Sequence, residues 1–292
     1  MSRNRVAANL NMLFTNVPLL QRYAAAAAAG FKLVEVSIPY SEPASALREA
    51  ADRHTSALRE AADRHSLQHT LINAPPGNWD LGFRGLASLK SQKDEFKKSL
   101  ETAIEYAKTL DCKRVHVMAG IPRSDDDVAN ASVTYSENVR FAAEKLKNHD
   151  LMCLIEPINK YTIPGYHLNN YDQAMEVIHL DTSNNLKIQY AMEVIHLDTS
   201  NNLKIQYDTF HAQQINGQIG ATMRRLKDHI GYIQVAQVPR RGACDSDGEI
   251  NYPFIFEEIS SINSSWVIGA EYLDAEGAKE SFGWIGKMAV EF

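Results

Sequence analysis

Four side chains with oxygen ligands stand where short apolar runs of the sequence end. They are Glu156, Asp208, Gln234 and Glu271. Each apolar run is typical of a buried strand, so in a closed barrel of parallel strands the four groups would meet at one end. Three carboxylates that lie close together repel one another unless protons or a cation relieve the repulsion. The pattern therefore predicts a divalent metal site, although each residue taken singly could instead cap a helix or accept a loop hydrogen bond.

Eight short apolar runs alternate with longer amphipathic segments. The expected strands are residues 5–9, 33–37, 68–73, 114–118, 152–156, 203–208, 231–235 and 266–271, and the clearest helical segments are 90–110 and 135–147. Most of the runs lack strict alternation, as strands buried on both faces do. Eight such units predict an α/β fold, a (β/α)8 TIM barrel, as a single domain over residues 1–292. A doubly wound open sheet is the main rival, but no GxGxxG follows the first strand.

The composition of the chain limits which partners and which cellular compartment are expected. The net charge of −6 argues against a broad nucleic-acid-binding surface, which needs clustered Lys and Arg. The cysteines, Cys112, Cys153 and Cys244, include no CxxC pair that would indicate a zinc knuckle. No apolar run approaches the ~20 residues of a membrane span, and the N-terminal stretch lacks the features of a secretory signal. We therefore expect a cytoplasmic protein with no membrane or nucleic-acid partner; a homo-oligomer stays open.

Two segments of the sequence occur twice in direct succession. SALREAADRH occupies residues 45–54 and 56–65, and AMEVIHLDTSNNLKIQY occupies residues 174–190 and 191–207. A period of 11 keeps helical phase to within about 20°, so the first duplication predicts a lengthened helix or a looped-out copy. Only the second NNLKIQY leads into Asp208, so that copy must form the strand if this carboxylate is needed. Either copy of AMEVIHL could form the helix, and Asn170 and Gln173 could cap the first.

Six short motifs resemble those of hydroxypyruvate isomerases and follow that family's order along essentially the whole chain. They are INAPPG at 72–77, EPIN at 156–159, DTFHAQ at 208–213, AQVPRRG at 236–242, GEINYP at 248–253 and GAEY at 269–272. The resemblance implies a xylose-isomerase-like TIM barrel that interconverts hydroxypyruvate and tartronate semialdehyde, a small-molecule substrate pair. The duplicated copies depart from the family's pattern.

The resemblance also implies a metal-binding and a proton-transfer role for the strand-end residues. One divalent ion would be bound by Glu156, Asp208, Gln234 and Glu271. Carboxylate and amide oxygens suit hard ions, so Mg²⁺ or Mn²⁺ is the expected cofactor. Glu156 and Glu271 would also be the two proton-transfer groups, and which of them is the base stays open. No nucleotide motif or organic cofactor is expected.

Other residues near the strand ends are candidates for binding the substrate. By resemblance, His211 would face a substrate oxygen and Arg241 would hold the substrate carboxylate in bidentate fashion, with Arg240 as its competitor. Asn73 and His116 stand at the ends of their expected strands and are further candidates. The alternative for His116 is an interior polar residue with a satisfied partner.

The predicted groups match the needs of an isomerisation through an enediolate. A cation stabilises the developing oxyanion, and a carboxylate with a tuned pKa moves the proton. The alternatives are a ketose epimerase, an inosose dehydratase-like enzyme, a DNA-repair nuclease of the same barrel type, and a non-catalytic barrel impaired by the duplications. Trp79 and Phe83 could form a lid over the mouth or pack in the core.

Overall fold

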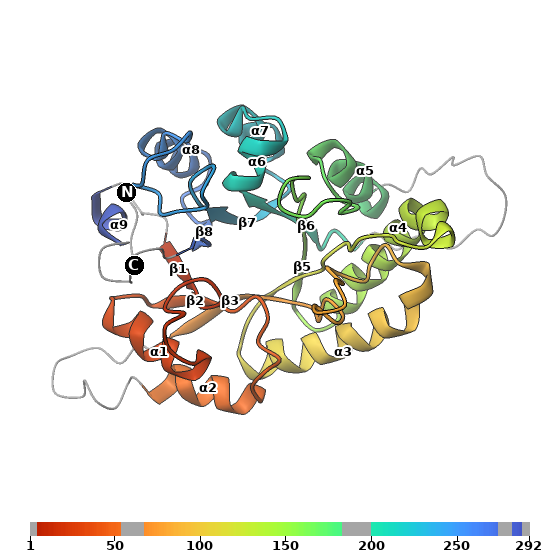
Figure 1. Ribbon diagram of the computed structural model, residues 1–292, viewed down its shortest axis with the longest axis horizontal. Coiled ribbons are helices and arrows are strands. Elements are labelled where there is room, and N and C mark those ends of the chain that lie inside the picture. The colour runs from red at the N-terminus through yellow and green to blue at the C-terminus, as the bar shows by residue number, and fades with distance from the viewer. Residues whose placement is uncertain (1–4, 54–66, 183–199, 274–281, 288–292) are drawn as a thin grey trace.

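The computed structural model describes residues 5–53, 67–182, 200–273 and 282–287. The strands are β1 (Arg5–Asn9), β2 (Leu33–Glu35), β3 (Gln68–Asn73), β4 (Arg114–His116), β5 (Met152–Ile155), β6 (Leu203–Asp208), β7 (Ile230–Val235) and β8 (Val267–Ala270). They pair in parallel with their sequence neighbours, and β1 also pairs with β8, so the sheet closes. Helices surround it (Figure 1). The predicted TIM barrel is confirmed, and all eight strands overlap the predicted runs, although β2 and β4 end two residues earlier than expected and β5 and β8 one residue earlier.

The helices form the outer layer. They are α1 (Leu19–Ala28), α2 (Ala44–Arg53), η1 (Lys90–Gln92), α3 (Lys93–Thr109), α4 (Asp125–Lys147), α5 (Tyr171–Thr182), α6 (Thr209–Ile215), α7 (Ile219–Leu226), α8 (Tyr252–Asn263) and α9 (Gly283–Lys287). The expected helix at 90–110 is split into η1 and α3. The one expected at 135–147 begins earlier because Ser124 caps it by accepting a hydrogen bond from the N–H of Asp127. None of the described helices combines the length and apolar character that a membrane crossing needs.

The interior of the barrel has an apolar layer and, two residues further along each strand, a mostly polar layer. The apolar layer consists of Ala7, Leu33, Leu71, Leu154, Tyr232 and Val267. The next inward positions are Asn9, Glu35, Asn73, Glu156, Gln234 and Gly269. Side chains two apart on a strand share a face, so five polar groups lie above this apolar layer, at the C-terminal ends of the strands. Gly269 leaves room for Glu35, because a Cβ there would lie 2.3 Å from its Oε2.

The two copies of the second duplication contribute to different elements, the first to α5 and the second to β6. The first copy of AMEVIHL forms α5, which Asn170 caps by accepting a hydrogen bond of 2.8 Å from the N–H of Gln173. The second copy of NNLKIQY forms β6 and leads into Asp208, as expected. The chain between them, 183–199, lies outside the described residues. Residues 56–65 also lie outside the described residues, so the lengthened helix expected from the first duplication stays a prediction.

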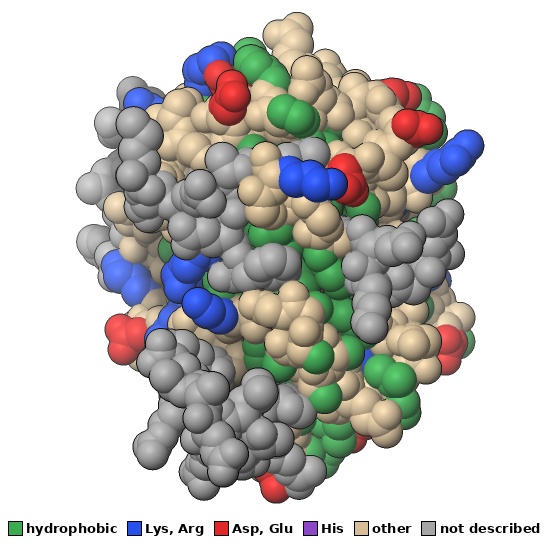
Figure 2. Space-filling view, turned by 90° about the vertical axis from the view of Figure 1, so that its left-hand side faces the viewer, with side chains coloured by type: hydrophobic (Ala, Val, Ile, Leu, Met, Phe, Trp, Pro, Cys, Tyr) green, Lys and Arg blue, Asp and Glu red, His purple; other side chains and the backbone are tan. Residues whose placement is uncertain are grey.

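The described surface is mixed in charge. Figure 2 shows one face on which acidic and basic side chains lie in small separate groups among apolar and neutral polar ones. Elsewhere on the described surface, exposed charges pair across neighbouring helices, as Lys93 does with Glu137 at 2.7 Å. Exposed pairs of this kind add little to stability, so the fold depends chiefly on the apolar side chains packed between the strands and the helices.

Candidate active site

A cavity of about 450 Å³ opens at the C-terminal ends of the strands. All six residues predicted to act on or bind the substrate line it: Asn73, His116, Glu156, His211, Arg241 and Glu271. The other two predicted ligands, Asp208 and Gln234, are completely buried and contact members of this lining. The structure therefore brings together all eight residues chosen from the sequence. Trp79 also lines the cavity, whereas Phe83 packs against the core.

The acidic residues gather around one histidine. Oxygens of Glu156 and Asp208 and a ring nitrogen of His211 all lie within 4.8 Å of one another. Nε2 of His211 is 3.6 Å from Oδ2 of Asp208 and 3.8 Å from Oε1 of Glu156. Asp208 ends β6 and its side chain caps α6 by accepting the N–H of Phe210 at 2.8 Å. This cap fixes the direction in which the carboxylate faces the cluster.

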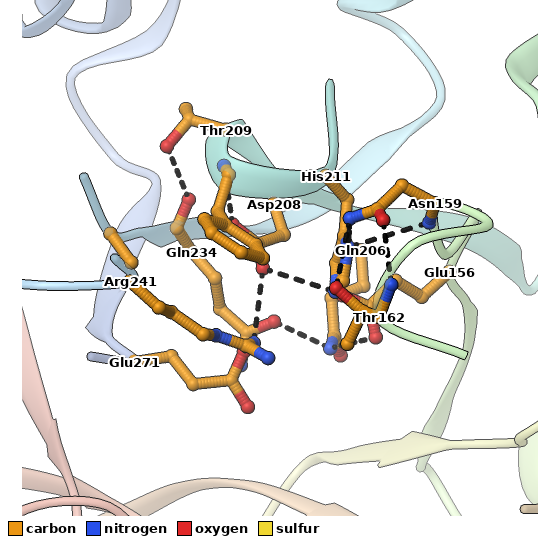
Figure 3. A network of polar contacts seen from close by, with 12 residues as sticks. Glu156, Asn159, Thr162, Gln206, Asp208, Thr209, His211, Gln234, Arg241 and Glu271 are labelled. Atoms are coloured by element: carbon orange, nitrogen blue, oxygen red, sulfur yellow. Dashed lines mark hydrogen bonds and ion pairs between the residues drawn. The ribbon is translucent and has the colours of Figure 1, made fainter. Parts of the chain in front are cut away.

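Arg241 brings a positive charge next to the carboxylates of the site. Its Nη2 donates to Oε2 of Glu271 at 2.8 Å and to Oδ2 of Asp208 at 3.4 Å (Figure 3). Its guanidinium lies over the ring of Phe210, 4.8 Å from the centroid. Arg240 is exposed and does not line the cavity. Of the two arginines, Arg241 therefore lines the cavity, and its contact with the substrate carboxylate stays a prediction.

Two amides that the sequence predictions did not use for this purpose form hydrogen bonds to the predicted ligands. Gln206, on β6, donates from Nε2 to Oε2 of Glu156 at 3.0 Å and to Oε1 of Gln234 at 2.6 Å. Asn9, on β1, donates to Oε1 of Glu271 at 3.3 Å. Polar residues in otherwise apolar strands were the available signal for both. Their positions show that the strand interiors orient the carboxylates as well as supplying them.

Glu35 is a further buried acid that the sequence predictions missed. Its Oε1 accepts hydrogen bonds from Asn9 at 2.7 Å and from Gln234 at 3.0 Å. Burial, followed by the charge of Glu271, raises its pKa to about 8. Glu35 therefore contacts Gln234 directly and Glu271 through Asn9. The available signal in the sequence was a charged residue at the end of a short, otherwise apolar strand.

Burial dominates the electrostatics of the ligand carboxylates. It raises the pKa of Glu156, and the charges of Glu271 and Asp208 raise it further. Burial raises the pKa of Asp208 to about 7, although Arg241 acts in the opposite direction. The pKa of Glu271 is also raised by burial, against hydrogen bonds from Arg241 and Asn9. A cluster of this kind gains from any additional positive charge.

Two imidazoles face the cavity in their neutral form. Burial lowers the pKa of His116 to about 3 and lowers that of His211, for which the charge of Arg241 is the second cause. Neither ring nitrogen of His116 has a hydrogen-bond partner in the described part of the chain, and Nδ1 lies 3.7 Å from Oε2 of Glu156. The described residues therefore supply no partner for an interior His116, and its role in binding the substrate stays a prediction.

The donor set fits a divalent cation. Oε1 of Glu156 is buried and has no hydrogen-bond partner among the described residues. It stands beside the carboxylate of Asp208 and a neutral imidazole, with an amide oxygen, Oε1 of Gln234, held nearby through Gln206. Carboxylate, amide and imidazole groups are the ligands of Mg²⁺, Mn²⁺ and similar ions. The buried group of Glu156, Asp208 and His211 could therefore hold a metal ion.

Comparison with known proteins places the chain in a family. The family described as "Xylose isomerase-like TIM barrel" matches residues 23–288. A Caenorhabditis elegans protein named "Putative hydroxypyruvate isomerase" is 72% identical over 99% of this chain and 98% of its own. A Cupriavidus necator protein named "2-oxo-tetronate isomerase" is 37% identical over 96% of this chain and 97% of its own.

A solved structure agrees with this assignment. It is titled as an AP endonuclease, family 2, from Brucella melitensis, and it is 30% identical with a TM-score of 0.82. The alignment covers 97% of this chain and 98% of that one. The resemblance found in the short motifs is confirmed over the full length of the chain. The chain belongs to the xylose isomerase-like TIM barrel family, and within it to the group whose members are named hydroxypyruvate and 2-oxo-tetronate isomerases.

Proposed function

We propose that the chain is a metal-dependent hydroxypyruvate isomerase. The observation that carries this proposal is the position of Glu156 and Glu271 on the wall of one cavity, with Asp208 buried against both the His211 imidazole and the Arg241 guanidinium. Two carboxylates able to move protons therefore face the same enclosed space as a candidate cation site. The names of the relatives support the choice of hydroxypyruvate.

The reaction moves two protons and exchanges the carbonyl with a hydroxyl. Hydroxypyruvate loses a proton from its hydroxymethyl carbon, which gives an enediolate spanning that carbon and the former carbonyl carbon. A proton then adds to the former carbonyl carbon, and the hydroxyl proton moves to its oxygen. The product is tartronate semialdehyde, with the same atoms and no change in the number of electrons.

The residues divide these tasks between them. Glu156, Asp208, Gln234 and Glu271 are the proposed metal ligands, and Mg²⁺ or Mn²⁺ the proposed ions. When bound, the cation supplies Lewis-acid stabilisation of negative charge on the substrate oxygens. Glu156 and Glu271 exchange protons with the two carbons, because both carboxylates line the cavity in which the substrate would lie.

The remaining lining residues would bind the substrate. His211 and His116 face its oxygens, and Asn73 offers Oδ1, which has no hydrogen-bond partner in the described structure. Arg241 is proposed to meet the carboxylate. Arg84, stacked 3.8 Å over the ring of Trp79, is a second guanidinium on the wall of the cavity. Each of these assignments follows from position in the cavity and the type of side chain.

A second substrate is favoured by one observation. The Cupriavidus necator relative is named for 2-oxo-tetronate, which carries the same 2-oxo acid group on a longer chain. The chemistry of the carboxylate pair would be unchanged for it. Both compounds therefore belong in the test, and a free ketose and abasic DNA belong there as representatives of the epimerase and nuclease alternatives.

The test is a proton NMR assay in heavy water with protein stripped of metal and then supplied with Mg²⁺ or Mn²⁺. We expect conversion of hydroxypyruvate with deuterium entering at the new C–H, and loss of conversion in E156Q and E271Q. E105Q, at an exposed position of α3, is the matched control. Conversion of a free ketose or cleavage of abasic DNA, without turnover of either 2-oxo acid, would replace this proposal.

The chemistry of the cysteines bears on the compartment. The three cysteines are buried and form no disulfide among the described residues, which suits a reducing compartment, and we propose a cytoplasmic location. A homo-oligomer remains a prediction. Fractionation of cells and light scattering of the purified chain test these two points.

A further inference from the structure

Backbone groups hold the side chain of Asn159 in one orientation. Its Oδ1 accepts hydrogen bonds of 2.9 Å from the N–H of Tyr161 and of 2.9 Å from the N–H of Thr162. Backbone N–H groups only donate, so the amide oxygen has to face them and Nδ2 has to face the opposite way. Asn159 is 2% exposed, so water does not compete for these bonds.

The donor side of this amide points at His211. Nδ2 of Asn159 lies 2.7 Å from Nδ1 of His211, and the backbone N–H of Asn159 lies 3.4 Å from the same atom (Figure 3). A ring nitrogen that meets two donors must be an unprotonated acceptor. An imidazolium, or a neutral ring protonated on Nδ1, would set hydrogen against hydrogen. The proton of the neutral ring is therefore on Nε2.

Nε2 is the atom that faces the carboxylates. It is 3.6 Å from Asp208 and 3.8 Å from Glu156, beyond ordinary hydrogen-bond length for both. His211 lines the cavity, so the N–H can be directed to a ligand. A protonated ring nitrogen has no lone pair to offer a cation, because the two roles exclude each other.

We propose that Asn159 is a positioning residue that fixes His211 as the Nε2–H tautomer, which makes His211 a hydrogen-bond donor to a substrate oxygen and keeps it out of the metal's ligand set. Only the identity of that oxygen rests on the proposed function; the tautomer does not. The cation would then be held by Glu156 and Asp208 with Gln234 and Glu271, and His211 would not be the third ligand that its distance from these two carboxylates alone would allow. A fixed donor aimed at the enediolate oxygen stabilises the charge that develops there.

The tautomer can be observed directly in ¹⁵N-labelled protein. Long-range ¹H–¹⁵N correlation spectra distinguish a protonated from an unprotonated ring nitrogen, and the missing signal in H211Q identifies the residue. We expect Nε2–H for His211 without metal and after addition of Mg²⁺. A wild-type spectrum showing Nδ1–H, or a change to Nδ1–H on Mg²⁺ binding, would overturn the proposal.

Two variants test the part played by Asn159. In N159D, one carboxylate oxygen can still accept from the two backbone N–H groups while the other faces Nδ1, so the tautomer should reverse to Nδ1–H. T162V removes only the contact of 3.1 Å between Nδ2 and Oγ1 of Thr162 and should keep Nε2–H. An N159D spectrum that still shows Nε2–H would contradict the positioning role. The wild-type spectrum decides the tautomer even if N159D does not fold.

Kinetics separate the inference from the proposed function. We expect kcat of N159D on hydroxypyruvate to fall about 100-fold, the size seen when one oxyanion donor is lost, with KM changed less. An unchanged kcat in a protein whose tautomer has reversed would refute the donor role. Absence of turnover in the wild type, with Nε2–H observed, would refute the proposed function and leave the tautomer standing.

Discussion

Arg241 donates a hydrogen bond of 2.8 Å to Glu271, and the same nitrogen lies 3.4 Å from Asp208. The loop after β7 thereby brings one positive charge to carboxylates that end two other strands. The side chain of Asp208 is completely buried, and those of Arg241 and Glu271 are 16% and 15% exposed. Removing one member of a buried ionic group leaves its partners uncompensated, which costs more than the group contributes when intact.

Substitution of Arg241 should destabilise the protein when no metal is present. We expect R241M to lower the free energy of unfolding by about 3 kcal/mol, because Asp208 and Glu271 lose their counter-charge. Urea denaturation in EDTA measures this. R240M, at the exposed neighbouring position, should stay within about 0.5 kcal/mol of the wild type. Equal stability of R241M and the wild type would show that the carboxylates are protonated together and do not need the arginine.

Glu35 should affect metal binding through the groups that it orients. E35L leaves the amides of Gln234 and Asn9 without their buried acceptor, and we expect divalent-ion affinity to fall about tenfold, as for other outer partners of metal ligands. E35Q retains an acceptor oxygen and should lose much less. Calorimetric titration with Mn²⁺ measures both variants. The account of Glu35 is wrong if E35L binds Mn²⁺ as tightly as E35Q does.

His69 should make stability depend on pH at a place remote from the metal site. It is buried, its Nε2 lies 2.8 Å from the hydroxyl of Tyr23, and burial lowers its pKa to about 4. The unfolded state, with a pKa of about 6.5, binds the proton more readily. Stability from this group is therefore complete above pH of about 6.5 and is lost as the pH falls towards 4, by at most about 3 kcal/mol.

H69Q tests this directly. Denaturation midpoints between pH 7 and 4 should fall less steeply in H69Q than in the wild type, because one group that takes up a proton on unfolding is gone. Y23F keeps the imidazole and should keep the steep decline. An H69Q curve parallel to the wild type would assign the acid sensitivity to other groups.

Much of the site could be predicted because the barrel repeats one rule. Each of these strands places a side chain at the mouth, two residues beyond the apolar layer of the barrel interior. Glu156 and Gln234 stand at this position and could be identified from the ends of their apolar runs. Asp208 and Glu271 could be identified in the same way, as residues at the ends of their own apolar runs. β5 and β8 end one residue before their glutamates.

The remaining residues depend on contacts that spacing does not encode. Gln206 and Glu35 lie within strands, and only the closed barrel shows that they touch the ligands from neighbouring strands. Asn159 belongs to a motif that was recognised, yet its role depends on the turn that directs two N–H groups at its oxygen. The start of α4 could have been predicted from Ser124 and the aspartates that follow it.

The 17-residue duplication should be dispensable. Deletion of 174–190 leaves one AMEVIHL behind the caps Asn170 and Gln173 and one NNLKIQY ahead of Asp208, so α5 and β6 can form as they do here. We expect Mn²⁺ affinity within about twofold of the full chain, since loop length changes closure cost only slowly, by ~0.6 kcal/mol per doubling. A deletion variant that binds Mn²⁺ far more tightly would show that the duplication impairs the mouth of the barrel.

The central claim is that the strand ends of this barrel hold one divalent ion at the site of proton transfer. Anomalous diffraction from crystals soaked in Mn²⁺ locates such an ion without any assumption about the reaction. The account predicts one strong peak within about 2.0–2.4 Å of oxygens of Glu156 and Asp208, with Gln234 and Glu271 completing the site. A peak elsewhere, or none at the mouth at saturating Mn²⁺, would contradict it.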